Sequence, residues 1–189
     1  MATIVVKGDD FDAYAALEPF ANCYTFHKWC KNLFTLNEEL IKQETLDAYY
    51  LMAFVTTLYE LSDAGLEYAE KQMAEVSSDA RYGLFKKMMT EILSELTEDD
   101  YLLLKYFRDS YCHIFTHNYN YYDKDGNLKT KLMTLYTKDR VKYSISAREF
   151  MEKAESVLGR TSCGELNFKK RLIKVCHPII SKYKMSFMQ

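Results

Sequence analysis

Five large apolar side chains recur every three or four residues between positions 82 and 96 of this sequence: Tyr82, Phe85, Met89, Ile92 and Leu96. Residues three and four apart lie on the same side of an α-helix, so this spacing gives the helix one continuous apolar face. Such a helix is stabilised mainly by packing that face against other elements. The chain is therefore expected to build its core from packed helices.

Glycine and proline, which turns and irregular loops use most, are scarce, with 6 and 2 copies in 189 residues. Their scarcity disfavours a loop-rich β fold and favours long helices. A hydrophobic share of 48% and this length suit a single domain with its own core. We predict an all-α domain over residues 1–189, a bundle of about five to six helices with a small β-hairpin insertion.

Local signals indicate where the longer helices begin and bend. One helix is predicted over residues 45–76, with Gly65 as the point where it bends or divides. Thr97 precedes three consecutive acids, so it is expected to cap a second helix whose positive end these acids favour. That second helix is expected to end near residue 118.

Two further helices are predicted in the last quarter of the chain. Ser146 and Glu149 have the spacing of a capping box, and Gly159 is a typical helix stop. A final basic helix is predicted over residues 165–176, and Pro178 is expected to interrupt whatever continues.

A β-hairpin is predicted after the second of these helices. An Asp-Gly pair at 125–126 lies between two strand-like runs, 119–122 and 128–136. The acids around this pair also imitate the opening of a calcium-binding EF-hand loop. In that loop the glycine belongs at the sixth place, whereas here it is at the fourth, and Thr134 stands where the closing acid belongs. A hairpin turn is therefore favoured over a calcium site.

Charge is divided unevenly along the chain. Residues 1–100 carry 19 acids and 8 bases, whereas residues 101–189 carry 8 acids and 17 bases. One interpretation is a basic face that attracts phosphate. The other is that the two halves neutralise each other across an internal contact. The sequence leaves both open.

The cellular compartment is predicted from cysteines and apolar runs. The five cysteines show no C-x-x-C spacing, and the first residues lack the pattern of a signal peptide. No apolar run approaches the roughly 20 residues that a membrane span needs. We expect a cytoplasmic protein with reduced thiols, no membrane association and no cofactor.

Arg108 and His113 are the candidate catalytic pair. An imidazole transfers protons near neutral pH, and a guanidinium holds phosphate oxygens, which together suffice for cutting RNA without metal. The ribose 2′-hydroxyl would attack the adjacent phosphate, leaving a 2′,3′-cyclic phosphate and a 5′-hydroxyl. Five helical residues place the two side chains about 140° apart, so the pair needs a cleft or a second copy of the chain. Asp109 either orients one of the pair or faces water.

The pattern of an arginine, a polar residue and, a few positions on, a histidine, past the midpoint of a mostly helical domain, resembles the HEPN superfamily. That family is known for metal-independent endoribonucleases of toxin–antitoxin, abortive-infection and CRISPR-associated systems. The resemblance covers residues 45–158 and implies a bundle of four or more helices, a homodimer with a composite site at its interface, and an RNA substrate. An antitoxin or regulatory protein is a further implied partner. By motif, Arg108, Asp109 and His113 carry over.

Two positions depart from patterns within that family. Asp109 stands where many members have asparagine or histidine. Phe115 stands where one toxin branch has a tyrosine that its partner enzyme modifies, so regulation by that modification is not expected here.

Residues that would contact the RNA are predicted after the motif and near the C-terminal end. Tyrosine rings stack on unpaired bases, and lysine and arginine neutralise phosphates. Strand packing and a solvated helix face are the simpler explanations for the same residues. The predicted substrate-binding residues are His117, Tyr119, Tyr121, Lys169, Lys170 and Arg171.

Two other functions remain open at this point. The first is a non-catalytic helical module that binds a partner protein or nucleic acid through the same groove. The second is a metal-dependent hydrolase that uses His113 and His117, which are spaced as zinc ligands often are. Ile114 occupies the place where such a hydrolase would have its glutamate. No third ligand is marked, although Asp123 or Cys112 would serve.

Overall fold

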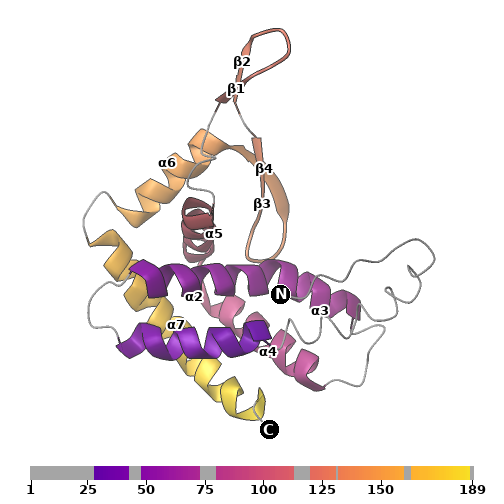
Figure 1. Cartoon of the computed structure of the whole chain (residues 1–189), viewed down its shortest axis with the longest axis vertical. Coiled ribbons are helices and arrows are strands. Elements are labelled where there is room, and N and C mark those ends of the chain that lie inside the picture. Colours follow the sequence, from indigo (N-terminus) through magenta and orange to yellow (C-terminus); the bar gives the residue numbers. More distant parts are fainter. Residues whose placement is uncertain are drawn as a thin grey trace, which may run out of the picture.

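The computed structural model describes residues 28–42, 48–72, 80–112, 120–130, 132–159 and 163–187. In these ranges the chain is mainly helical with a small antiparallel β part, which confirms the predicted fold class (Figure 1). A helix over residues 28–42 is followed by α2 (Ala48–Glu60), the π-helical turn η2 (Leu61–Gly65), α3 (Leu66–Gln72), α4 (Ala80–Glu95), α5 (Glu98–Cys112), β1 (Asn120–Tyr122), β2 (Leu128–Thr130), β3 (Leu132–Tyr136), β4 (Lys142–Ser146), α6 (Ala147–Leu158) and α7 (Gly164–Phe187).

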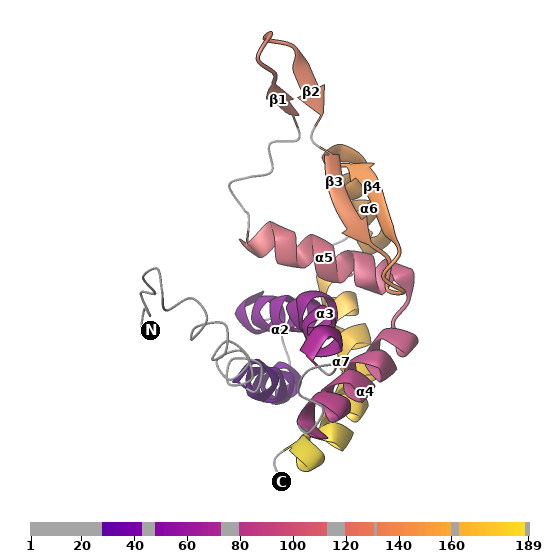
Figure 2. The ribbon, with the colours of Figure 1, turned by 90° about the vertical axis from the view of Figure 1, so that its right-hand side faces the viewer.

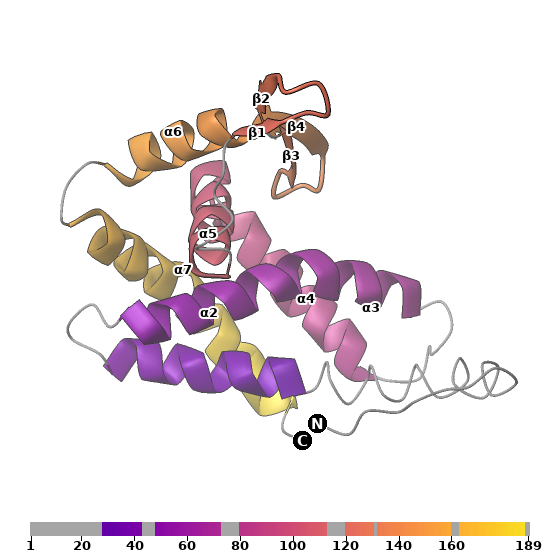
Figure 3. The same ribbon diagram turned by 45° about the horizontal axis from the view of Figure 1, so that its top comes forward.

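The helices pack around one large apolar core. Helix α2 packs against α5, and α4 runs beside α7 (Figure 2). The helix over residues 28–42, drawn in indigo, lies alongside α2 (Figure 3). Its Phe34 ring meets the Phe187 ring of α7 edge to face at 5.5 Å between centroids. All five residues of the periodic pattern in 82–96 are buried, which confirms the predicted apolar face.

The long helix predicted over residues 45–76 changes geometry over residues 61–65, so Gly65, where a bend or division was expected, is the last residue of the altered turn. The predicted ends of this helix lie outside the described residues. Residues 61–65 form a π-helical turn between α2 and α3, in which the Ser62 hydroxyl donates to the Tyr59 carbonyl at 2.8 Å. A Cβ on Gly65 would lie 3.3 Å from Leu61 Cδ2 and 3.4 Å from Phe85 Cζ. The glycine therefore lets this turn approach α4 closely.

Both predicted helix caps are present. The Thr97 hydroxyl accepts from the Asp100 amide at 3.0 Å and donates to the Asp100 carboxylate at 2.8 Å. Ser146 and Glu149 form a capping box at the start of α6, and Gly159 ends that helix with φ 78°. The predicted end of α5 near residue 118 lies outside the described residues, which stop at Cys112.

Pro178 does not interrupt the last helix, so the predicted stop is wrong: α7 continues to Phe187. A proline inside a helix removes one backbone hydrogen bond and costs about 3 kcal/mol. Ile179, Ile180 and Phe187 lie beyond it and are buried. Burying one such side chain contributes about 1.5–3 kcal/mol, so packing of the three outweighs the cost of the proline.

The predicted hairpin is present, and its turn is built by Asp123. One carboxylate oxygen of Asp123 accepts from the backbone amides of Asp125 at 3.0 Å and Asn127 at 2.8 Å. The Asn127 amide in particular holds the pKa of the Asp123 carboxyl below its usual value. The hairpin interpretation of this segment is confirmed, because β1 and β2 on either side of the turn pair antiparallel.

A second hairpin, β3–β4, was not predicted. The run 128–136 looks like one strand, but Leu128–Thr130 pairs with β1 and Leu132–Tyr136 pairs with β4. Apolar Tyr143 and Ile145 alternate with polar neighbours in β4, a signal that would have identified this strand. The inner face of β3–β4 closes a smaller core formed by Leu102, Leu135 and Phe150, which joins α5 to α6.

No helix in the described part of the chain is both long enough and apolar enough to cross a membrane.

Candidate functional site

Two of the three predicted catalytic residues lie on the last turns of α5. Arg108 and Asp109 are described, whereas His113 follows directly after the last described residue of that helix. His117 and Tyr119 also fall in the range 113–119, outside the described residues. Tyr121 is in β1, but its side chain is outside the described part. The structure thus shows the surroundings of Arg108, whereas the place of His113 stays a prediction.

Arg108 is held between two carboxylates. Its Nε donates to Glu60 Oε1 at 2.7 Å, and its Nη1 donates to Asp109 Oδ1 at 2.7 Å. Glu60 is the last residue of α2, so this contact joins the ends of the two packed helices. The guanidinium carbon also lies 5.6 Å from the centre of the Tyr59 ring. These contacts fix the guanidinium in one position while leaving 23% of the side chain exposed.

Asp109 is buried and orients Arg108. The residue is 4% exposed, and its carboxylate accepts hydrogen bonds from Lys105 Nζ at 2.9 Å and from Arg108. The interpretation in which Asp109 faces water is therefore wrong. A buried carboxylate requires compensating partners, and the two cations of α5 supply them.

The electrostatics around Arg108 keep it charged. Burial lowers its pKa, but hydrogen bonds to Asp109 and Glu60 outweigh that effect and raise it above the usual value. Burial raises the pKa of the neighbouring Tyr101 hydroxyl to about 12. In this cluster the two cations, Lys105 and Arg108, are in contact with the two anions, Glu60 and Asp109.

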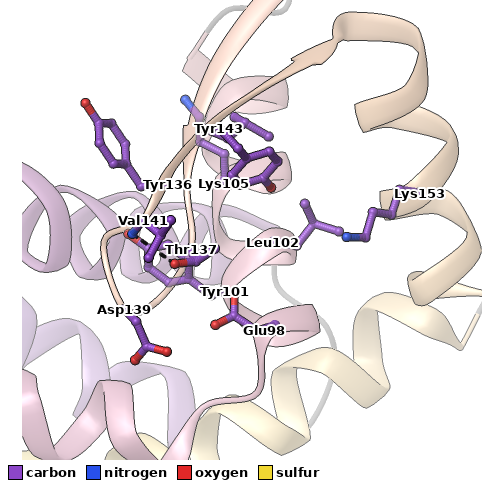
Figure 4. A pocket seen from close by; sticks show the side chains of 11 residues that line it. Glu98, Tyr101, Leu102, Lys105, Tyr136, Thr137, Asp139, Val141, Tyr143 and Lys153 are labelled. Atoms are coloured by element: carbon purple, nitrogen blue, oxygen red, sulfur yellow. Dashed lines mark hydrogen bonds between the residues drawn. The ribbon is translucent and has the colours of Figure 1, made fainter.

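A cavity of about 500 Å³ adjoins this cluster (Figure 4). It lies between α5, the β3–β4 hairpin and Lys153 of α6. Lys105 lines the cavity and also contacts Asp109, so it connects the cavity to the Arg108 cluster. Figure 4 shows Tyr136 and Tyr143 toward one end and Glu98 and Asp139 toward the other. Sequence reasoning missed this cavity because it missed the second hairpin.

The three basic residues of α7 that were predicted to contact RNA differ in their exposure and in their partners. Lys169 is only 2% exposed, so the prediction that it contacts RNA is wrong. Helix α7 turns this position toward the core, next to the buried Phe168. Arg171 donates to Asp100 Oδ1 at 2.9 Å, which ties α7 to the start of α5. Lys170 is exposed. Asp100 and Arg108 are eight residues apart, so the contact of Arg171 lies about 12 Å along α5 from Arg108.

Charges of the two halves of the chain meet in ion pairs. In the described ranges, five acids from residues 1–100 pair with bases from residues 101–189, as the interpretation of an internal contact between the halves expects for these residues. The pairs are Glu38–Lys184, Glu60–Arg108, Glu70–Arg140, Glu91–Lys182 and Asp100–Arg171.

Metal binding by His113 and His117 falls outside the described residues. Among those that are described, no three histidine, cysteine or acidic side chains are grouped as metal ligands would be.

No protein-family model, curated protein or solved structure matches the chain.

Proposed function

We propose that the chain is a metal-independent endoribonuclease of the HEPN type, in which Arg108 binds the scissile phosphate and His113 transfers the proton. The observation that supports this most is the guanidinium fixed at the end of α5 and still partly open to solvent. A cation that Asp109 already holds in place needs little reorganisation when charge develops on the phosphate.

The reaction follows from these two groups. His113 removes the proton of the ribose 2′-hydroxyl, and the 2′-oxygen forms a bond to phosphorus as the bond to the 5′-oxygen breaks. The 5′-oxygen leaves with a proton from the His113 of the partner subunit in the proposed homodimer. Arg108 stabilises the negative charge on the non-bridging oxygens during the transfer.

The cavity beside Lys105 suggests how the RNA lies. Lys105 and Arg108 are three residues apart on α5, about 4.5 Å along the axis, which is within reach of one nucleotide. We propose that an unpaired base enters the cavity against Tyr136 or Tyr143 while its phosphate faces Arg108. The stacking of one base on an aromatic ring is worth about 1–3 kcal/mol.

Product analysis tests the proposed chemistry. Purified protein with excess chelator should cut a single-stranded RNA into fragments that end in 2′,3′-cyclic phosphate and begin with 5′-hydroxyl. The same oligonucleotide with 2′-O-methyl groups throughout should remain intact, because it lacks the nucleophile. Cutting of the methylated strand, or activity that requires added zinc, would contradict the proposal and favour the metal-dependent alternative.

A second candidate function is a non-catalytic module that binds a partner protein. It is favoured by the β1–β2 hairpin, which extends from the helical body (Figure 1). In this hairpin and at the start of β3, large apolar side chains are highly exposed, such as Tyr122 at 73% and Leu132 at 72%. Exposed apolar groups of this kind often mark protein interfaces. Purified protein that binds a partner protein or RNA but never cuts RNA would favour this function. That the partner is an antitoxin or another regulatory protein stays a prediction.

A further inference from the structure

We propose that Glu60 is a built-in substitute for the substrate phosphate: its carboxylate occupies the edge of Arg108 that an RNA phosphate would use, and the phosphate must displace it. The inference rests on the proposed function for the identity of the incoming anion.

The geometry of the guanidinium carries the first step. The Nε and Nη2 groups point the same way along one edge, which matches two oxygens of a carboxylate or a phosphate. Glu60 lies on this edge, with Nε at 2.7 Å and an ion pair to Nη2. Asp109 takes Nη1 on the other side. A phosphate that seeks two hydrogen bonds from one edge therefore meets Glu60 first.

The two carboxylates differ in how easily they can leave. The Asp109 side chain is 5% exposed and is also held by Lys105. Removing its cations would leave a buried, uncompensated charge. The Glu60 side chain is 26% exposed and can turn into water. A partly exposed ion pair contributes little net stability, so an incoming anion can replace it.

The backbone at Glu60 is helical, so the displacement involves its side chain alone. The π-helical turn η2 begins at the next residue. Ser62 of that turn donates to the Tyr59 carbonyl, and the Tyr59 ring packs on the Tyr101 ring of α5 at 5.7 Å between centroids. Single π-helical turns inside α-helices occur frequently at functional sites. Here the turn directly follows the residue whose carboxylate meets Arg108.

The test compares Glu60→Gln with Glu70→Gln. Both remove one negative charge, but Glu70 lies on α3 and pairs with Arg140 instead of Arg108. Binding of a fluorescent, uncleavable 2′-O-methyl RNA oligonucleotide is measured by anisotropy at fixed salt. Glu60→Gln should bind about two- to fivefold more tightly than Glu70→Gln, the size expected when one exposed competing ion pair is removed. Adding Arg108→Ala should abolish that gain.

Equal affinity of Glu60→Gln and Glu70→Gln would overturn the inference, as would a gain that survives Arg108→Ala. Should Glu60→Gln lose its cooperative unfolding transition, Glu60→Asp and Glu70→Asp replace the pair. The shorter aspartate withdraws the carboxylate from Arg108, so Glu60→Asp should still bind more tightly than Glu70→Asp, and equal affinities overturn the inference. Failure of the proposed function is distinguishable, because it appears as absent cleavage in every variant, whereas the binding gain does not require cleavage.

Discussion

Ser146 and Glu149 close the first turn of α6 with reciprocal hydrogen bonds. The Glu149 amide donates to the Ser146 hydroxyl at 3.2 Å, and the Ser146 amide donates to the Glu149 carboxylate at 3.0 Å. We predict that Ser146→Ala lowers the free energy of unfolding by about 1 kcal/mol, because the first amides of α6 lose their acceptor. Urea unfolding followed by circular dichroism measures this change. Ser144→Ala, an exposed position of β4, is the control; equal effects of the two substitutions would contradict the prediction.

Residues whose partners are close in sequence could be predicted, and residues whose partners are distant could not. The Thr97 cap and the Gly159 stop depend on groups within about a turn, so the sequence pattern specifies them. Arg108 was identified as a cation, but its partner Glu60 is 48 positions away, and no local pattern indicates that contact. Lys169 belongs to a basic run, and only the packing of α7 determines that it is buried.

Two glycines in helical segments differ in their surroundings, and this difference is testable. A Cβ on Gly83 of α4 would meet nothing within 4 Å, whereas a Cβ on Gly65 would meet Leu61 and Phe85 at 3.3–3.4 Å. We predict that Gly83→Ala stabilises the fold by about 0.5–1 kcal/mol through helix propensity. Gly65→Ala should gain less or destabilise, because its neighbours must shift. The same urea measurement compares them, and an equal gain for both would show that the π-helical turn tolerates a side chain.

Elements that rely on tertiary packing were the ones that sequence reasoning missed. Helix α7 continues past Pro178 because three buried residues beyond it pack into the core. The β3–β4 hairpin exists because its inner face covers Leu102 of α5 and Phe150 of α6. Helix α4, in contrast, shows most of its buried face in its own periodicity. The fold class could therefore be predicted, whereas the cavity that the second hairpin closes could not.

At the scale of the whole molecule, the proposed composite site needs a second copy of the chain. On a regular helix Arg108 and His113 would be about 140° apart, so a facing surface would have to bring them to one phosphate. We predict that sedimentation equilibrium gives twice the 22.3 kDa mass of one chain. A monomer that retains full ribonuclease activity would contradict the composite site. It would not contradict cleavage by a site within one chain.

Ion pairs between the two halves of the chain bear on where RNA would bind under the proposed function. Basic side chains of α7 and of the β3–β4 turn contact acids of the first hundred residues, as in Glu91–Lys182 and Glu70–Arg140. Arg108 is paired in the same way with Glu60, so pairing alone does not single it out. What distinguishes Arg108 in the proposal is its second carboxylate, the buried Asp109, which still holds the guanidinium when Glu60 turns away.

Turnover of RNA by Arg108→Ala and His113→Ala is the most direct test of the proposed ribonuclease. Arg148→Ala, at an exposed position of α6, is the matched control for loss of an arginine. Both site variants should cut a single-stranded RNA at least about 100-fold more slowly than the wild type, the usual contribution of one acid–base group or one charge-stabilising group, while Arg148→Ala retains wild-type activity. All variants should keep the same helical circular dichroism spectrum. RNA cleavage by folded Arg108→Ala or His113→Ala at the wild-type rate would contradict the account.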